Sequence, residues 1–130
     1  MTTTPITWGS EFRVNTTTVD PQYGSSVARL QNGSFVVTWT DRSGTGGDTS
    51  GWAVRGQVYF PDGTPAGGEF LVNSTTSGNQ INASVAATAD GGFVVVFDDE
   101  SQTGGDTSGA ATRAQRYDAT GARVGGEFLV

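Results

Sequence analysis

The chain has 130 residues and a mass of 13.4 kDa, enough for one domain but not for two with separate cores. Gly occurs 20 times and Thr 19 times, whereas Leu occurs 3 times and Lys is absent, so turn and strand formers outnumber helix formers and an all-β fold is expected. The absence of His, Cys and Lys excludes Ser-His and Cys-His nucleophiles, Schiff-base chemistry, Cys/His zinc sites and disulfides.

The net charge is -6 and the isoelectric point lies near pH 4.3. Such a field repels phosphate backbones and anionic lipids, so we expect no nucleic-acid partner. No apolar run approaches the length of a membrane span, so membrane insertion is not expected either. The first fifteen residues lack the basic start and apolar block of a secretory signal peptide.

A tandem repeat of 58 residues organises the sequence. Residues 9–66 align without a gap onto residues 67–124, and 29 of the 58 positions are identical. The opening motif Glu-Phe-x-Val occurs at residues 11–14 and 69–72 and again within 125–130. We therefore expect a single domain over residues 1–130, made of two repeats and a terminal repeated strand.

The first repeat shows four strand-like runs in chain order, at residues 11–15, 26–30, 34–40 and 52–60. Asn32-Gly33 between the second and third runs predicts a tight hairpin with positive φ at both central residues, and Asp90-Gly91 stands at the same place in the second repeat. Each repeat is thus predicted to be a four-stranded antiparallel meander.

Such a meander cannot cover both of its faces alone, so copies are expected to cover one another as β-propeller-like blades or, alternatively, as a strand-exchanged β-sandwich. If the last three strands of each repeat pair with the next Glu-Phe-x-Val motif, residues 11–15 are left without a sheet. An unpaired strand invites a partner, so the sequence predicts a homo-oligomer, a dimer or trimer, in which N-terminal segments cross between chains.

The repeated motifs Glu-Phe-x-Val-Asn, Ser-Val-Ala, Gly-x-Phe-Val-Val-x-Trp/Phe and Arg-x-Gln-x-Tyr cover residues 9–130 almost completely. This series resembles the repeats of large bacterial secreted and calcium-dependent surface proteins. The two-repeat format is also similar to small bacterial lectins that build propeller-like rings from two-blade chains. These resemblances imply a secreted or cell-surface location in a bacterium and recognition of sugars.

The longest block shared by both repeats, Thr-Gly-Gly-Asp-Thr-Ser-Gly, follows the third strand instead of forming one. A carboxylate with loop amides and hydroxyls suits a neutral polyol, so we interpret the block as a sugar site with nearby arginines as donors. The candidate ligand-binding residues are Gly46, Gly47, Asp48, Thr49, Ser50, Gly51, Trp52 and Arg55 in the first repeat, and Gly104, Gly105, Asp106, Thr107, Ser108, Gly109 and Arg113 in the second.

A structural interpretation of the same block stays open. Its glycines would then supply positive φ angles, and Asp48 and Asp106 would cap a turn by accepting backbone N–H groups. Trp52 offers an aromatic face to a pyranose or packs internally, and Ala110 replaces it in the second repeat. Gln22 and its equivalent Gln80 are either turn anchors or ligand contacts.

Calcium is the alternative ligand, held by oxygen donors among Asp41, Asp48, Asp99 and Asp106, although no metal-binding loop motif is present. We expect no metal or other cofactor to be required. Catalysis by paired carboxylates is not expected, because Asp98 and Glu100 have no acidic counterparts in the first repeat.

The sequence thus predicts a non-enzymatic, carbohydrate-binding protein that recognises neutral sugars such as mannose-type hexoses through loops repeated in each half. Its weak single sites would act by multivalency on glycans. The rival hypothesis is a structural or adhesive repeat module of a bacterial surface protein, with or without bound calcium.

Overall fold

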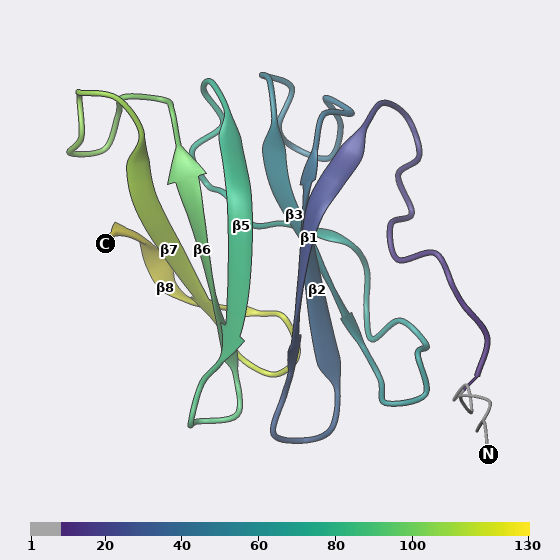
Figure 1. The fold of residues 1–130 in the computed structure, drawn as a ribbon. Helices are drawn as coiled ribbons and strands as arrows, with labels where there is room; N and C mark the ends of the chain where they lie inside the picture. Colours follow the sequence, from purple (N-terminus) through teal and green to yellow (C-terminus); the bar gives the residue numbers. More distant parts are fainter. Residues whose placement is uncertain (1–8) are drawn as a thin grey trace, which may run out of the picture.

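The computed structural model describes residues 9–130, which form eight β-strands and no helix. The first sheet contains β1 (Gln22–Arg29), β2 (Phe35–Asp41), β3 (Ala53–Tyr59) and β4 (Phe70–Leu71). The second sheet contains β5 (Gln80–Ala87), β6 (Phe93–Asp99), β7 (Ala111–Tyr117) and β8 (Arg123–Leu129). The predicted all-β fold with two four-stranded antiparallel sheets is confirmed (Figure 1). In the described part of the chain, no helix is present that has the length and apolarity of a membrane span.

The last strand of each sheet is formed by the motif that follows its meander in the chain. β4 pairs with β3 and β8 pairs with β7, so both Glu-Phe-x-Val motifs that follow a meander complete that meander's sheet, as predicted. The predicted strand at residues 11–15 is wrong, because these residues enter neither sheet. The physical reason is positional: the equivalent residues 70–71 lie beside β3, and no strand among the described residues lies beside 11–15 in that way.

The turns between β1 and β2 and between β5 and β6 are longer than predicted. Leu30 N donates to Ser34 O, and only Gly33, not Asn32, has a positive φ, of 87°. The carboxamide Oδ1 of Asn32 accepts the Ser34 amide at 2.9 Å, which closes a local turn without positive φ at Asn32.

The two sheets differ in the length of their last strand. β8 pairs with β7 from Arg123 onward, whereas Pro65, which aligns with Arg123, makes only an isolated bridge to Tyr59. Proline has no N–H to give to a ladder, so β4 is reduced to two residues.

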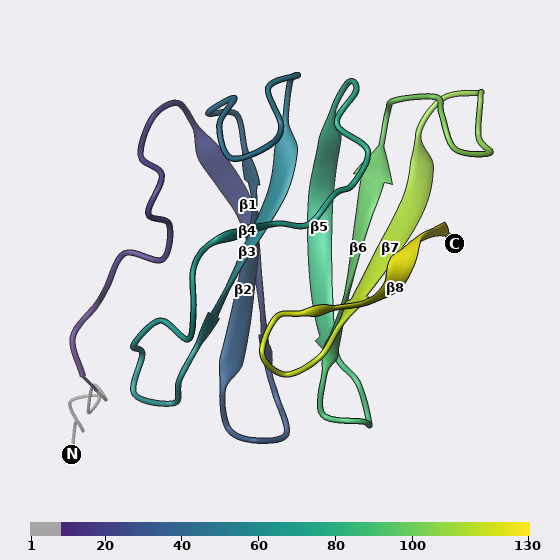
Figure 2. The same ribbon diagram turned by 180° about the vertical axis from the view of Figure 1, so that it is seen from behind.

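The sheets pack face to face, and β5 lies across β1, β2 and β3 (Figures 1 and 2). We call the faces that meet the inner faces; in the first sheet this face carries Val36, Val54 and Val58, and in the second it carries Val85, Phe93, Val95, Phe97 and Tyr117. The opposite, outer face of the first sheet carries Phe35, Val37, Trp39 and Tyr59, against which Val14 packs.

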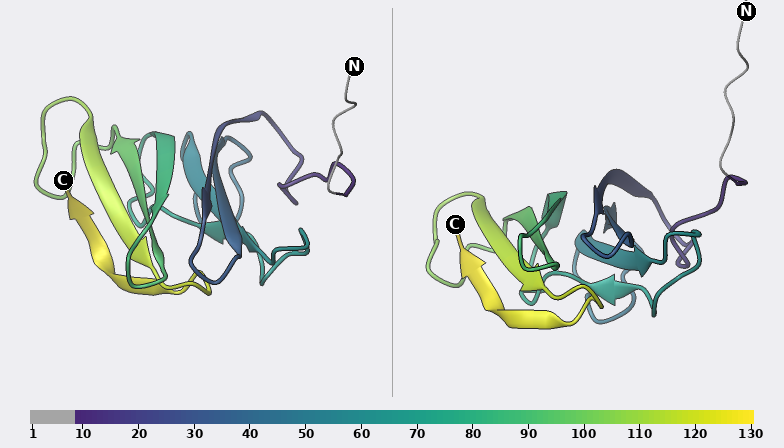
Figure 3. Two further views of the ribbon diagram at one scale, coloured as in Figure 1. Left: turned by 60° about the horizontal axis from the view of Figure 1, so that its bottom comes forward. Right: turned by 90° about the horizontal axis from the view of Figure 1, so that it is seen from below.

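The segment that precedes β1 runs along the outer side of the first sheet (Figure 3). The link that follows β4 crosses from the first sheet to β5 (Figure 2). These two segments are equivalent in the repeat, and they lead into the strands β1 and β5 in the same way.

Candidate functional site

The two loops that carry the shared block Thr-Gly-Gly-Asp-Thr-Ser-Gly, called the invariant loops because the block is identical in both repeats, lie at the same end of their sheets. Residues 45–51 join β2 to β3, and residues 103–109 join β6 to β7 (Figure 1). In both, an arginine from the following strand lies directly beneath the loop. The Arg55 guanidinium donates through Nη2 to Thr45 O, and Arg113 donates in the same way to Thr103 O.

This contact explains why the loops keep a glycine at one place. Gly46 has a φ of 63°, and a Cβ there would come within 2.5 Å of the Arg55 guanidinium nitrogens. Gly104 has a φ of 64° and lies in the same way against Arg113. A side chain would be strained by the backbone and would also displace the arginine. Gly46 and Gly104 therefore have the positive φ angles that the structural interpretation of the block expects.

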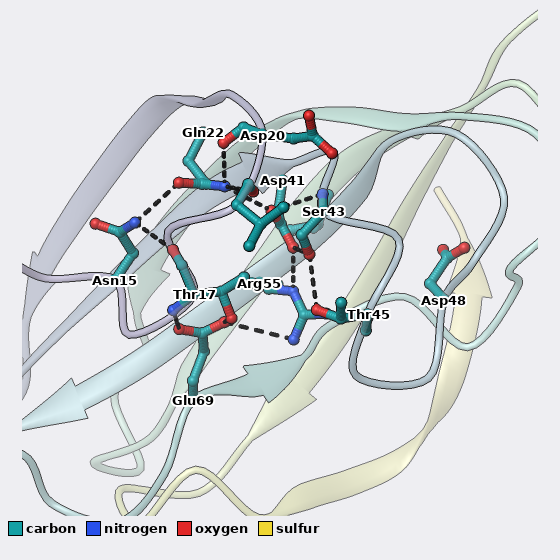
Figure 4. A network of polar contacts seen from close by, with 12 residues as sticks. Asn15, Thr17, Asp20, Gln22, Asp41, Ser43, Thr45, Asp48, Arg55 and Glu69 are labelled. Carbon is teal, nitrogen blue, oxygen red and sulfur yellow. Dashed lines mark hydrogen bonds and ion pairs between the residues drawn. The ribbon is translucent and has the colours of Figure 1, made fainter.

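Arg55 is the centre of a buried polar network on the outer face of the first sheet (Figure 4). Its Nε lies 2.5 Å from Asp41 Oδ2, and its Nη1 lies 3.4 Å from Glu69 Oε1. Asp41 also accepts the Ser43 hydroxyl at 2.7 Å and Gln22 Nε2 at 3.1 Å. The positive charge is thus shared between carboxylates of β2 and of the residue just before β4.

The network holds the segment that precedes its sheet. Glu69 Oε2 accepts the Thr16 amide at 3.0 Å and the Thr16 hydroxyl at 2.8 Å. Asn15 Nδ2 donates to Gln22 Oε1 at 2.9 Å, and Gln22 Nε2 donates to Val19 O at 2.7 Å. Gln22 is therefore a turn anchor, one of the two roles that its repetition indicated.

The second repeat builds the same network from equivalent atoms. Arg113 Nε lies 2.6 Å from Asp99 Oδ2, and its Nη1 lies 3.4 Å from Glu127 Oε1. Gln80 Nε2 donates to Asp99 at 2.8 Å, and Glu127 Oε2 accepts the Ser74 amide at 2.7 Å. This network lies at the junction of the two sheets, because it is on the inner face of the second sheet.

The surroundings of Asp41 and Asp99 favour the charged carboxylate. Burial raises the pKa of each group, but the hydrogen bonds from Ser43, Arg55 and Gln22 together bring the pKa of Asp41 below its ordinary value. The pKa of Asp99 is lowered in the same way, against burial, by Gln80, Ser101 and Arg113. Both carboxylates are therefore charged, and they accept hydrogen bonds from groups of the protein itself.

Asp48 and Asp106, the carboxylates of the predicted sugar site, have unequal surroundings. Asp48 is 2% exposed, and it accepts Ser50 N at 2.9 Å and Asn73 Nδ2 at 2.8 Å. Asp106 is partly exposed and accepts Ser108 N at 2.9 Å. Both carboxylates cap their own turn, and within residues 9–130 only Asp48 also accepts a hydrogen bond from a second side chain.

That second side chain, Asn73, is the joint between the repeats. Its Oδ1 accepts Val54 N at 2.8 Å from the first sheet, and its Nδ2 lies 2.8 Å from Asp48 Oδ2 and 3.1 Å from Gln80 Oε1 in the second. Sequence reasoning did not single out Asn73, Glu69 or Glu127. Their signal was present in the repeated Glu-Phe-x-Val-Asn motif, which was interpreted as a strand.

The remaining predicted residues of the loops lie at the surface, and they are Gly47, Thr49, Ser50, Gly51, Gly105, Thr107, Ser108 and Gly109. Trp52 packs edge-on against Tyr23, with ring centroids 4.9 Å apart, and the Arg42 guanidinium lies 5.4 Å from its ring centre. Tyr23 is itself exposed. An aromatic and cationic surface therefore adjoins the first loop, whereas Ala110 leaves none beside the second.

The acidic residues considered for calcium do not converge. Among residues 9–130, no group of three or more acidic residues is placed to hold a metal ion. Asp41 and Asp99 face arginines, and Asp48 is bonded to a carboxamide.

Comparisons of the chain with models of known protein families, with curated proteins and with solved structures found no match.

Asn73 and Asn15 form a matched pair that measures the joint. We expect Asn73→Ala to lower the free energy of unfolding by about 3 kcal/mol, because it leaves the Val54 amide and the Oδ2 atom of the buried Asp48 without a partner. Asn15→Ala breaks only local bonds and should cost about 1 kcal/mol. Urea unfolding at low protein concentration measures the loss of stability in both variants. Equal losses would contradict the role of Asn73 as the joint between the repeats.

The lowered pKa values of Asp41 and Asp99 predict acid sensitivity. Their contribution to stability is present above the ordinary pKa of 3.8 and is lost as the pH falls through the lower value of the folded state. The free energy of unfolding should therefore fall between about pH 5 and about pH 2. The double variant Asp41→Asn, Asp99→Asn should be less stable at neutral pH and should show a flatter acid limb, as followed by urea titrations at each pH.

Proposed function

We propose that the chain is a non-enzymatic structural repeat module, in which each sheet is a unit built to stack on the next. The observation that supports this most directly is which partners the polar groups shared by both repeats bond to. In both repeats the invariant loop, the arginine and the repeated carboxylates bond to one another. In the second repeat the same set of groups adjoins the joint residue Asn73.

A structural role accounts for the identity of the loops without a ligand. Gly46 and Gly104 make room for arginines, Asp48 and Asp106 cap turns, and Thr45 and Thr103 supply carbonyl acceptors. The glycine and aspartate tasks need the residue types that both repeats keep, whereas the carbonyl acceptor is a backbone group that any residue supplies. A buried arginine and carboxylate pair is costly when one partner is lost, so every member of the network is constrained.

The loop carboxylates test this proposal. Asp48→Ala removes a buried cap and one of the acceptors of the Asn73 carboxamide, so it should lower the free energy of unfolding by about 2 kcal/mol, whereas Asp106→Ala should cost about 1 kcal/mol or less. Urea unfolding measures both. If instead both variants keep full stability, the loops are not structural and the proposal fails.

Recognition of neutral sugars is the second candidate function, favoured by the surface around Trp52. The exposed Tyr23 ring and the Arg42 guanidinium both lie against the ring of Trp52, and the exposed residues Thr49 and Ser50 precede Trp52 in the chain. An aromatic face with polar neighbours suits a pyranose. Because the second repeat has Ile81, Glu100 and Ala110 at the aligned positions, we expect one such site in each chain, not two.

A glycan array with three proteins tests the sugar candidate. Trp52→Ala gives the first repeat the residue that the second has naturally, so binding should fall at least about tenfold, as expected for loss of a stacking contact. Thr107→Ala, in the loop without aromatic neighbours, is the control and should bind like the wild type. Absence of any glycan bound by the wild type would remove this candidate and leave the structural proposal unaffected.

A further inference from the structure

A hollow of about 240 Å³ opens on the outer face of the first sheet. Its walls include Val14 and Asn15, from the segment before β1, and Val37 and Trp39, from β2. The volume is smaller than the roughly 300–1,000 Å³ of sites for drug-sized ligands, so the hollow suits a single small ligand such as one sugar ring.

The equivalent space in the second repeat is filled by the protein itself. Asn73 and Phe97 align with Asn15 and Trp39, and they are at most 1% exposed. They lie on the side of the second sheet that packs against the first sheet. The internal junction therefore occupies there the space that is open on the outer face of the first sheet.

The lining of the hollow differs between the repeats at three positions, and each difference gives the first repeat a hydrogen-bonding side chain. Tyr23, Ser25 and Trp39 stand where the second repeat has Ile81, Ala83 and Phe97. Exposure to water accounts for a polar residue at 23 and at 25, but Trp39 is only 3% exposed. A buried apolar ring is sufficient for packing at this position, as Phe97 shows, so the extra N–H of Trp39 has no packing role.

The indole N–H of Trp39 is shielded from water and has no acceptor among the described residues. A buried indole N–H usually finds a hydrogen-bond partner, because a buried donor without one is costly. Since Trp39 belongs to the lining of the hollow, a ligand that carries an acceptor oxygen can supply this partner.

Asn15 provides the complementary atom, an acceptor. Its Nδ2 donates to Thr17 O at 2.6 Å and to Gln22 Oε1 at 2.9 Å, and among residues 9–130 its Oδ1 has no donor. In the second repeat the same atom of Asn73 accepts the Val54 backbone amide at 2.8 Å. The position is therefore suited to an amide N–H, and a ligand in the hollow can provide one.

We propose that this hollow binds the acetamido group of an N-acetylated sugar. The carbonyl oxygen of the group accepts the Trp39 indole N–H, its amide N–H donates to Asn15 Oδ1, and its methyl group packs on Val14 and Val37. The lining contains no charged residue, which favours a neutral ligand. Trp52 is not part of the lining, so this inference goes beyond both the structural function and the sugar candidate proposed above.

Two features favour a sugar over a peptide as the carrier of the amide. Tyr23 and Ser25 line the hollow and are exposed, and their hydroxyl groups are donors and acceptors of the kind that bond to sugar hydroxyls. The small volume also suits one ring, whereas an extended peptide needs a longer groove.

Binding requires a small movement of one wall, because the Trp39 N–H is shielded from solvent. Val14 and Asn15 lie in a segment that belongs to neither sheet, so they can shift without breaking a strand ladder. We therefore expect this segment to admit the acceptor oxygen of the ligand.

The indole N–H signals in heteronuclear NMR spectra test the site directly. The chain has three tryptophans, and the signal of Trp39 is the one that disappears in Trp39→Phe. Titration with N-acetylglucosamine should shift the Trp39 signal with a Kd of about 1 mM, as expected of one small ligand. Glucose, which lacks the acetamido group, should bind at least about tenfold more weakly.

Variants matched to the second repeat test the same contact. Trp39→Phe introduces the residue that the second repeat has and removes the N–H, so binding followed by the backbone amide signals of β1 and β2 should weaken at least about tenfold. Ser84→Ala, at an exposed serine outside the hollow, is the control and should bind like the wild type. Circular dichroism checks the fold of each variant, and the titration of the wild type does not depend on them.

An unmoved Trp39 signal in the presence of N-acetylglucosamine would overturn the proposal, as would binding that Trp39→Phe leaves unchanged. Equal binding of glucose would reject the acetamido group as the part recognised. Equal binding of N-acetylalanine methylamide, a minimal peptide unit, would reject a sugar as its carrier. The structural function is judged separately by the unfolding of the Asp48 and Asp106 variants, and none of these binding results changes it.

Discussion

A buried arginine that must be surrounded by acceptors is the constraint on which both halves of the molecule depend. Taking a guanidinium out of water is costly unless carboxylates and carbonyls satisfy it completely. Arg55 finds these partners in Asp41, Glu69 and Thr45, which belong to a strand end, an edge segment and a loop. Because the three partners come from separate segments, one charge holds the loop and both neighbouring segments of the sheet in place.

The same interaction links each sheet to the chain that precedes it. Glu69 and Glu127 each pair with the arginine through Oε1. The two oxygens of each carboxylate also accept hydrogen bonds from amides and hydroxyls, of residues 16–17 for Glu69 and of residues 74–75 for Glu127. Asn73 then extends the second network into the first sheet. A repeat is therefore stabilised by its own network and, at its leading edge, by the repeat before it.

This organisation changes the meaning of the shared loop. Its glycines and aspartates satisfy local backbone and side-chain demands, so their identity in the two repeats follows from the network. Asp48 and Asp106 nevertheless differ in burial, because only one of them has a following repeat docked beside it within the described residues. The aromatic surface beside the first loop lies to one side, where Tyr23 and Trp52 meet.

Much of the architecture was determined by local sequence. Alternating apolar runs, turn residues and the 58-residue period were enough to predict the strand content, the antiparallel order and the use of β4 and β8 to complete the sheets. Residues 11–15 were predicted to form a strand from their own sequence pattern, but among the described residues only the equivalent 70–71 form one, because they lie beside β3. Tertiary structure alone brought Arg55 to Asp41 and Glu69 and gave Asn73 its joint role, because these contacts join residues that no local pattern relates. Periodicity specifies which way a strand faces, whereas the partner of a buried charge depends on how separate segments meet.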